Sequence, residues 1–339
     1  MTTPLIPSAR AIVAAPMAGG PTTVALATAV ATAGGFPFLA AGYRTSAAVY
    51  AETEQLRARR IPFGVNLFVP SHQPVDETAF AAYAHDLQPE ADRYGLRLDP
   101  HPRIDDDGWS DKIRMLLAHP VPIVSFTFGL PPADDIAAVK RCGSRVVLTV
   151  TNPDEAQAAA ERGADGLVVQ ALAAGGHSAT FDPATIPKPV EIATLVAQVR
   201  AVTTLPLIAA GGIDSAEAVG VVREAGAEAA AVGTLLLRTD EAGTSPVVRA
   251  ALADPDYGHT VITRAFTGRP ARALPNGFVI RHPDAPTGYP AVHHLTRPIR
   301  GAAFAAGDSD RVNLWAGTGW RNAPTGPAGV VIRALSPDR

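Results

Sequence analysis

A histidine that follows two glycines is the side chain in this sequence best suited to transfer a proton. His177 lies in the stretch VVQALAAGGHSATFDP, directly after Gly175 and Gly176. An imidazole is readily tuned to accept a proton near neutral pH, and glycines let a backbone approach a ligand closely. A single loop histidine is more often structural than catalytic, so the assignment depends on where the fold places His177.

Two pairs of small residues could bind a phosphate group. Gly211 and Gly212 precede a segment with helical signals, and Gly233 and Thr234 follow the next apolar run. Backbone N–H groups at such positions, with a helix amino terminus behind them, bind phosphate without a lysine. A lone glycine pair could equally make a tight turn, but two pairs in successive loops favour a phosphate-bearing ligand.

Asn66 and Gln170 each end an otherwise apolar run. A buried amide without hydrogen-bond partners costs roughly 1 to 3 kcal/mol, so both side chains should face polar groups. Those groups are either neighbouring loops or a planar heteroaromatic ligand, such as an isoalloxazine ring, that carries both donors and acceptors. The sequence leaves both interpretations open.

The residues named so far follow short apolar runs that lack the alternation of a half-buried strand. Such runs are typical of a parallel sheet that is covered on both faces. Eight of them alternate with helical segments, at residues 11–17, 36–42, 62–69, 122–128, 145–150, 165–170, 205–211 and 228–234. This number predicts a (β/α)8 TIM barrel rather than an open doubly wound sheet, and in such a barrel the active site lies at the carboxyl ends of the strands.

Helix start signals occur between the runs. Asn152 is a predicted N-cap, with Pro153 at the first helical position and Glu155 completing a capping box. Asp214 and Glu217 have the same spacing, so Asp214 is predicted to cap the helix that follows the first glycine pair.

Two segments exceed a minimal barrel. Residues 71–119 are an expected insertion with a helix at 76–87, and a Pro- and Gly-rich tail begins after Arg238. We expect the tail, with loops over 276–290, to cover the barrel mouth rather than form a core of its own. The expected division is a barrel over 1–238, a substrate or lid domain over 239–308 and a segment over 309–339 that returns to the barrel.

The charge and cysteine content of the sequence argue against several kinds of binding partner and against a disulfide or a metal site. The formal net charge is −3, and neither sign of charge gathers in a long run, which argues against binding to nucleic acid or to an anionic membrane. The single Cys142 excludes an internal disulfide, and no Cys/His cluster has the spacing of a metal site. The amino terminus lacks the features of a secretory signal and no apolar stretch reaches bilayer length, so a cytoplasmic enzyme with a small-molecule partner is expected.

Along almost its whole length the sequence resembles the nitronate monooxygenases, formerly called 2-nitropropane dioxygenases, which are FMN-dependent (β/α)8 enzymes. The likeness is carried by APMAGG at 15–20, PFGVNLFVP at 62–70, VSFTFGLPP at 124–132, VVQALAAGGHSATF at 168–181, LPLIAAGGID at 205–214, AVGTLLL at 231–237, TRAFTGRPAR at 263–272 and LWAGTG at 314–319. No GxGxxG fingerprint follows the first strand, which argues against a Rossmann-type nicotinamide site.

The resemblance implies a noncovalent FMN, and it assigns roles to thirteen residues. The FMN phosphate would lie at Gly211, Gly212, Gly233 and Thr234, and the flavin ring would contact Pro16, Met17, Ala18, Asn66, Thr149, Gln170, Gly175 and Gly176. His177 matches the family histidine that acts as the base. The implied reaction converts an alkyl nitronate, or a nitroalkane after loss of its α-proton, with O2 into a carbonyl compound and nitrite.

Departures from the family pattern surround this histidine. Ala171, Ala173 and Ala179 replace Gly, Glu and Gly of the family motif, which leaves the FMN framework intact and the substrate open. The alternatives are an FMN-dependent NAD(P)H:quinone or enoyl reductase, a non-catalytic flavin-binding barrel, and a phosphosugar lyase or isomerase without flavin. Barrel enzymes often dimerise, so a homodimer is one expected assembly.

By the same resemblance, the tail residues Tyr289, His293 and His294 lie over the barrel mouth. Tyr289 would either shape the substrate pocket or pack within the lid. Arg269 and Arg272 are expected to hold the tail to the barrel by hydrogen bonds to carboxylates or carbonyl groups.

Overall fold

Eight parallel strands close into a barrel in the computed structural model, which describes residues 4–71 and 73–336. The strands are β1 (Ile12–Ala14), β2 (Phe36–Ala40), β3 (Gly64–Phe68), β4 (Ile123–Thr127), β5 (Arg145–Val150), β6 (Gly166–Gln170), β8 (Leu207–Ala210) and β9 (Ala229–Val232), and they pair in this order with β9 beside β1. The predicted (β/α)8 barrel and its eight runs are therefore confirmed. Residues 1–3 at the amino terminus, where no secretory signal is expected, and residues 337–339 of the expected returning segment lie outside the described residues.

Both faces of the barrel strands are buried, which explains the continuous apolar runs. Val13, Phe38, Val147 and Ile208 belong to a cluster that fills the barrel interior, while their neighbours along each strand pack beneath the surrounding helices. A strand whose successive side chains point in opposite directions into two apolar layers has no position left for polar alternation.

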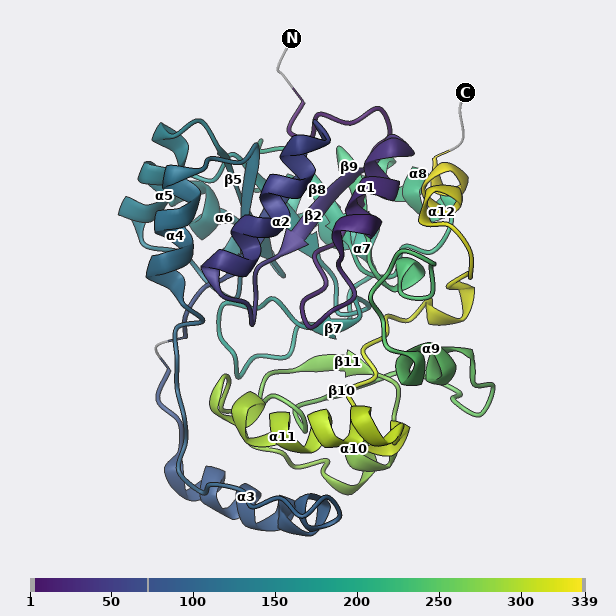
Figure 1. The fold of residues 1–339 in the computed structure, drawn as a ribbon. Helices are drawn as coiled ribbons and strands as arrows, with labels where there is room; N and C mark the ends of the chain where they lie inside the picture. The colour runs from purple at the N-terminus through teal and green to yellow at the C-terminus, as the bar shows by residue number, and fades with distance from the viewer. Residues whose placement is uncertain (1–3, 72, 337–339) are drawn as a thin grey trace.

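The outer layer contains α1 (Val24–Thr32), α2 (Ser46–Ala58), α4 (Trp109–Ala118), α5 (Ala133–Arg141), α6 (Pro153–Glu161), α7 (Ile192–Arg200), α8 (Ala216–Glu224) and α12 (Ala328–Leu335). Two of these helices come from segments that exceed a minimal barrel in sequence. α4 ends the expected insertion yet packs between α2 and α5, and α12 returns from the carboxyl terminus to pack against α1 and α8 (Figure 1). No helix among the described residues is both long and apolar enough to cross a membrane.

The predicted helix caps are right in one case and wrong in the other. Asn152 caps α6 by accepting a hydrogen bond from the Glu155 amide at 2.9 Å, although Glu155 itself accepts from the Thr151 amide. α8 is capped by Ser215, not by Asp214. The Asp214 carboxylate instead accepts a hydrogen bond at 2.9 Å from Asn322, a residue distant in sequence that the spacing rule could not take into account.

The lid lies below the barrel mouth in Figure 1. It contains α9 (Pro246–Ala253), α10 (Gly277–Arg281), α11 (Ala291–Ala306) and a small antiparallel sheet of β10 (Val261–Thr263), β11 (Ala271–Ala273) and β7 (Gly176–His177). Short 3-10 turns occur at η1 (Thr234–Leu236), η2 (Ser309–Arg311) and η3 (Trp320–Asn322). Because β7 comes from the loop after β6, the barrel places His177 at the edge of the lid sheet, where β7 lies beside β11 (Figure 1).

The expectation that the tail has no core of its own is wrong. α3 (Glu77–Asp92), the helix of the insertion, packs against α11, and Phe80 and Tyr83 join Phe266, Phe278 and Leu295 in a separate buried cluster. The lid alone would leave this apolar face uncovered. The helix that covers it comes from much earlier in the chain, since the hydrogen bond from Tyr83 to the Ala265 carbonyl joins residues 182 positions apart. The segment 276–290 is also not entirely loop, because Asn276 caps α10.

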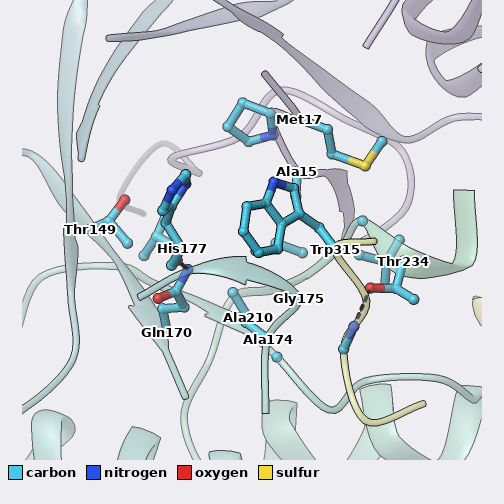
Figure 2. A pocket seen from close by; sticks show the side chains of 18 of the residues that line it. Ala15, Met17, Thr149, Gln170, Ala174, Gly175, His177, Ala210, Thr234 and Trp315 are labelled. Atoms are coloured by element: carbon cyan, nitrogen blue, oxygen red, sulfur yellow. Dashed lines mark hydrogen bonds between the residues drawn. The ribbon is translucent and has the colours of Figure 1, made fainter. Parts of the chain in front are cut away.

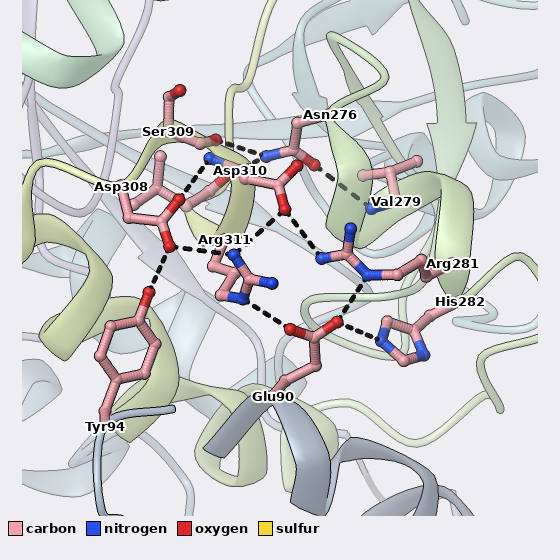
Figure 3. A network of polar contacts seen from close by, with 11 residues as sticks. Glu90, Tyr94, Asn276, Val279, Arg281, His282, Asp308, Ser309, Asp310 and Arg311 are labelled. Carbon is pink, nitrogen blue, oxygen red and sulfur yellow. Dashed lines mark hydrogen bonds and ion pairs between the residues drawn. The ribbon is translucent and has the colours of Figure 1, made fainter. Parts of the chain in front are cut away.

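A polar network fastens α3 to the lid (Figure 3). The Glu90 carboxylate, 8% exposed, lies 2.6 Å from Arg281 Nε and 2.5 Å from Arg311 Nε. Burial alone would raise the pKa of Glu90, but hydrogen bonds from the two guanidinium groups lower it below its ordinary value. Arg311 also forms ion pairs with Asp308 and Asp310, so the positive charges of the network are compensated by carboxylates besides Glu90.

Replacing Glu90 by glutamine is expected to lower the free energy of unfolding by about 2 kcal/mol. Removing one partner of a buried pair typically costs 3 to 5 kcal/mol, and the loss here is smaller because Arg281 is 41% exposed and Arg311 keeps two other carboxylates. Urea denaturation measures the change, with Asp86→Asn on the exposed face of α3 as the control. Equal stability of the two variants would show that the network contributes nothing.

Candidate active site

One cavity of about 250 Å³ opens at the carboxyl ends of the barrel strands, and all thirteen residues singled out from the sequence line it (Figure 2). They are Pro16, Met17, Ala18, Asn66, Thr149, Gln170, Gly175, Gly176, His177, Gly211, Gly212, Gly233 and Thr234. Segments from β1, β3, β5, β6, β8 and β9 therefore meet at one place, as strand ends of a closed barrel must.

Gly211 and Gly212 form one side of a backbone cradle at the amino end of α8. Both have positive φ, +101° and +74°, and a Cβ at Gly211 would lie 2.8 Å from the amide nitrogen of Ala174 and 3.0 Å from the oxygen of Ala171. Within residues 4–71 and 73–336, the N–H groups of Gly211 and Gly212 donate to no protein acceptor. Free amides beside a helix amino terminus are suited to an anionic group.

Gly175 is needed for a close approach between two protein segments. A Cβ there would lie 2.5 Å from the amide nitrogen of Gly317, in the segment that returns from the lid. The Gly317 amide donates to Thr234 Oγ1 at 3.0 Å (Figure 2). The returning segment thus closes the cavity between the loops after β6 and β9.

The polar side chains at the strand ends differ in how their hydrogen-bonding capacity is used. Asn66, 4% exposed, donates through Nδ2 to Ser125 Oγ at 3.0 Å and to Thr127 Oγ1 at 2.9 Å. Thr127 Oγ1 lies 3.3 Å from Thr149 Oγ1, so the three strands are connected. This leaves Asn66 Oδ1 as an acceptor on the cavity wall.

Gln170 uses both ends of its amide to hold the loop that carries His177. Its Nε2 donates to the His177 carbonyl at 3.3 Å, and its Oε1 accepts from the Ala179 amide at 2.8 Å. Of the two interpretations left open by the sequence, bonding to a neighbouring loop therefore satisfies Gln170. The side chain still lines the cavity.

The His177 ring is held among aromatic side chains. Its Nε2 lies 2.9 Å from Thr267 Oγ1, and its centroid lies 5.6 Å from Phe128, 5.8 Å from Tyr289 and 5.4 Å from Trp315. Register with Ala271 of β11 fixes its backbone. The lid and the barrel thus position the imidazole together.

Burial, together with the charges of two nearby arginines, keeps His177 neutral. Burial, followed by the charges of Arg269 and Arg300, lowers the pKa of His177 from its usual 6.5 to about 3. Among the described residues, Arg269 Nε and Nη2 have no hydrogen-bond partner, and Arg300 donates to neutral groups such as Asn313 Oδ1 and the His293 ring. Both cations therefore give this end of the cavity an excess of positive potential.

The expected attachment of the tail to the barrel is confirmed. Arg269 Nη1 donates to the Ser178 carbonyl at 3.0 Å and to the Thr180 carbonyl at 2.8 Å, and Arg272 Nε donates to the Leu172 carbonyl at 2.8 Å. All three acceptors belong to the loop after β6. The guanidinium carbon of Arg269 also lies 4.1 Å from the centre of the Phe128 ring.

Sequence reasoning missed an aromatic wall in the cavity, formed by Tyr43, Phe68, Phe128 and Trp315. Tyr43 and Phe128 have positive φ, +65° and +83°, a costly conformation for bulky residues that is common at functional sites. Both residues come shortly after a barrel strand. Their position at the end of an apolar run was therefore the sequence signal that could have identified them as cavity residues.

The histidines of the tail occupy different environments. His293 stacks on Tyr43 with ring centroids 4.1 Å apart, and the Tyr289 hydroxyl donates to Tyr43 Oη at 3.2 Å. Tyr43 belongs to the barrel, and the Tyr289 ring also contacts Phe128 and His177, so Tyr289 packs between the lid and the barrel beside the cavity without lining it. His294 lies 3.0 Å from Asp105 and does not line the cavity.

Acidification is expected to destabilise the fold through His177 and His293. Burial is the first cause that lowers both pKa values, and the charge of Arg300 adds to it. Below the usual pKa of 6.5 the unfolded chain binds protons that the folded-state imidazoles do not accept, down to about pH 3 for His177 and lower still for His293, so the free energy of unfolding falls as the pH falls below 6.5. Urea denaturation at pH 7 and pH 5 should show a smaller pH effect in His293→Asn than in the wild type, with exposed His85→Asn as the control. An unchanged pH effect in His293→Asn would contradict this expectation.

Comparison with known proteins places this arrangement in a family. The family model described as nitronate monooxygenase matches residues 4–338. The chain is 34% identical over 336 residues to a nitronate monooxygenase of Pseudomonas aeruginosa, covering 96% of this chain and 94% of that protein. It is 33% identical to a probable nitronate monooxygenase of Staphylococcus aureus, covering 95% and 92%.

Solved structures agree with this result. A nitroalkane oxidase from Streptomyces ansochromogenes superposes with a TM-score of 0.93 and 44% identity, covering 97% of this chain and 95% of that chain. FabK from Thermotoga maritima superposes with a TM-score of 0.74 at 23% identity, covering 98% and 93%, a likeness that concerns the fold alone. The match over nearly the whole chain and the identity to two curated relatives lead to one conclusion: the chain belongs to the nitronate monooxygenase family.

Proposed function

We propose that this protein is an FMN-dependent enzyme that oxidises alkyl nitronates, and more slowly the neutral nitroalkanes, with O2 to a carbonyl compound and nitrite. The observation that carries the proposal is the single cavity that combines a backbone cradle for an anion, a neutral histidine and two nearby cations. Family membership supports the reaction class, and the chemistry of the side chains supports the assignment of roles.

The residues fit a flavin mononucleotide. The free amides at Gly211 and Gly212 suit its phosphate, and Gly233 and Thr234 line the same cavity. When bound, FMN would supply the redox chemistry by accepting electrons from the nitronate and passing them to O2.

Residues from several strands would hold the flavin ring. Pro16, Met17 and Ala18 provide a mostly apolar edge, and Asn66 Oδ1 provides an acceptor. Thr149 adds a hydroxyl. In this arrangement Gly175, Gly176 and Gln170 act chiefly by fixing the loop that brings His177 to the cavity.

The substrate preference follows from the electrostatics around His177. An imidazole whose pKa is about 3 is a weak base, so removing the α-proton of a neutral nitroalkane is demanding. A nitronate already carries the negative charge that Arg269 and Arg300 attract. We therefore infer that the nitronate is the faster substrate and that His177 acts as the base only for the neutral form.

The lid lies against the substrate site through Thr267 and Tyr289, which contact the His177 ring, while Trp315 of the returning segment lines the cavity itself. We propose that residues 239–308 form the substrate domain, attached to a barrel over 1–238 and followed by the returning segment 309–339. At this end of the cavity, the aromatic side chains of Tyr43, Phe68 and Phe128 present little polar surface to a ligand. Such a wall suits an alkyl chain and excludes water.

The competing activity is reduction of a quinone or an enoyl thioester by NAD(P)H on the same fold. The likeness to FabK is too distant to support it, and the sequence offers no nicotinamide fingerprint. A non-catalytic flavin-binding barrel would need no neutral histidine between two cations.

The visible spectrum of the purified protein, followed by oxygen uptake, tests the proposal. We expect a flavin spectrum, with FMN released on denaturation, and oxygen uptake with nitrite formation when an alkyl nitronate is added. Rapid bleaching by NADH without a nitronate would favour the reductase instead. A colourless protein that binds no added FMN would refute the proposed function.

A further inference from the structure

Thr267 is a buried hydroxyl that contacts the His177 ring and that no function described so far uses. It lies between β10 and β11 and is 1% exposed. Its Oγ1 lies 2.9 Å from His177 Nε2 and 3.3 Å from the Arg269 carbonyl oxygen. A hydroxyl has one hydrogen to donate, so the two contacts are not equivalent.

The carbonyl contact decides the direction of the contact with His177. A carbonyl oxygen only accepts, so both contacts are hydrogen bonds only when the Thr267 hydroxyl donates its hydrogen to the Arg269 carbonyl oxygen. Its oxygen then accepts from His177, which requires a hydrogen on Nε2. In a neutral imidazole, a hydrogen on Nε2 leaves the lone pair on Nδ1.

The surroundings keep this arrangement fixed. The Thr267 and Gly268 amides both donate to the Arg264 carbonyl, at 3.1 and 2.8 Å, in a turn that Gly268 allows with φ of +73°. The rings of Phe128, Tyr289 and Trp315 surround the imidazole. Within the part of the chain that the structure describes, His177 Nδ1 has no protein partner, and His177 lines the cavity.

We propose that Thr267 is a positioning residue that holds His177 in the Nε2–H tautomer, so that the Nδ1 lone pair is the site that accepts the α-proton of a nitroalkane. In this step the α-carbon C–H bond breaks and an Nδ1–H bond forms. The electron pair of the broken bond moves into the nitro group, which gives a nitronate and an imidazolium. The step rests on the proposed function, but the tautomer itself does not.

The tautomer is measured directly by 15N NMR of histidine-labelled, flavin-loaded protein, with His177→Asn used to assign the signals. We expect a pyrrole-like Nε2 and a pyridine-like Nδ1 for His177. A pyridine-like Nε2 would overturn the proposal even if the enzyme oxidises nitronates normally. Absence of nitronate turnover with the expected spectrum would instead refute the proposed function and leave the tautomer standing.

Three variants test the consequence for turnover. Thr267→Val removes the acceptor, and we expect kcat/KM for a neutral nitroalkane to fall by about 10-fold or more while that for its nitronate changes by less than about 3-fold. Thr267→Ser keeps the hydroxyl and should restore both values. Thr263→Val is the control, because that buried threonine accepts from the Ala265 amide and does not contact His177. Equal losses for nitroalkane and nitronate in Thr267→Val would point to a merely structural role and overturn the proposal.

Discussion

Replacing His177 by asparagine is expected to lower kcat/KM for a neutral nitroalkane by about 100-fold or more, because positioned proton transfer contributes 10²- to 10⁴-fold. A preformed nitronate has already lost its α-proton, so its kcat/KM should fall by less than about 10-fold. The His177 side chain lines the cavity and contacts Thr267. Arg269 and Arg300, which attract the nitronate, are unchanged in the variant. Oxygen uptake with matched nitroalkane and nitronate measures both values.

Flavin content serves as the internal control for this variant, since the phosphate cradle lies on other loops. His85→Asn, on the exposed face of α3, controls for the loss of a histidine as such. If His177→Asn turns over the neutral nitroalkane as fast as the wild type, the assignment of His177 as the base is wrong. An equal loss for both substrates would assign His177 to substrate positioning instead.

Replacing Gly211 by alanine is expected to weaken FMN binding by about 100-fold or more, since the cradle would lose its hydrogen bonds to an anion and each such bond to a charged group is worth 1.5 to 3 kcal/mol. The added Cβ would lie 2.8 Å from the Ala174 amide nitrogen and 3.0 Å from the Ala171 oxygen. Both contacts are backbone atoms, so the loop after β6 or the cradle must shift. Quenching of flavin fluorescence gives the dissociation constant.

Gly163→Ala is the matched control for the backbone strain. Gly163 has φ of +94°, close to the +101° of Gly211, and a Cβ there meets nothing within 4 Å. Both variants should lose about 1 kcal/mol of stability from the left-handed conformation, but only Gly211→Ala should lose FMN affinity. Equal FMN affinity in the two variants would remove Gly211 from the phosphate site.

Much of the fold could be predicted because it depends on local signals. Each barrel strand is a short run that is apolar on both faces, and the run itself reveals the strand. The cap at Asn152 was equally local. The cap at Asp214 was not, because a side chain from the returning segment bonds to that carboxylate and leaves Ser215 to cap α8.

The lid shows where such prediction fails. Its core needs Phe80 and Tyr83 from the insertion and Phe266 from the tail, and no local pattern pairs segments so far apart. The place of Tyr43 and Trp315 in the cavity could not be predicted for the same reason. The turn after β2 and the segment after η2 meet only in the folded chain.

The sequence by itself determined the barrel, and closing eight parallel strands brings their carboxyl ends, with the thirteen predicted residues, to one cavity. The protonation state of His177 was decided only by the tertiary structure. Its neutrality comes first from burial and then from the charges of Arg269 and Arg300, and its contact with Thr267 comes from a turn of the lid. Charge and hydrogen-bond direction act through space over a few ångströms, so they depend on which distant segments the fold brings to the ring.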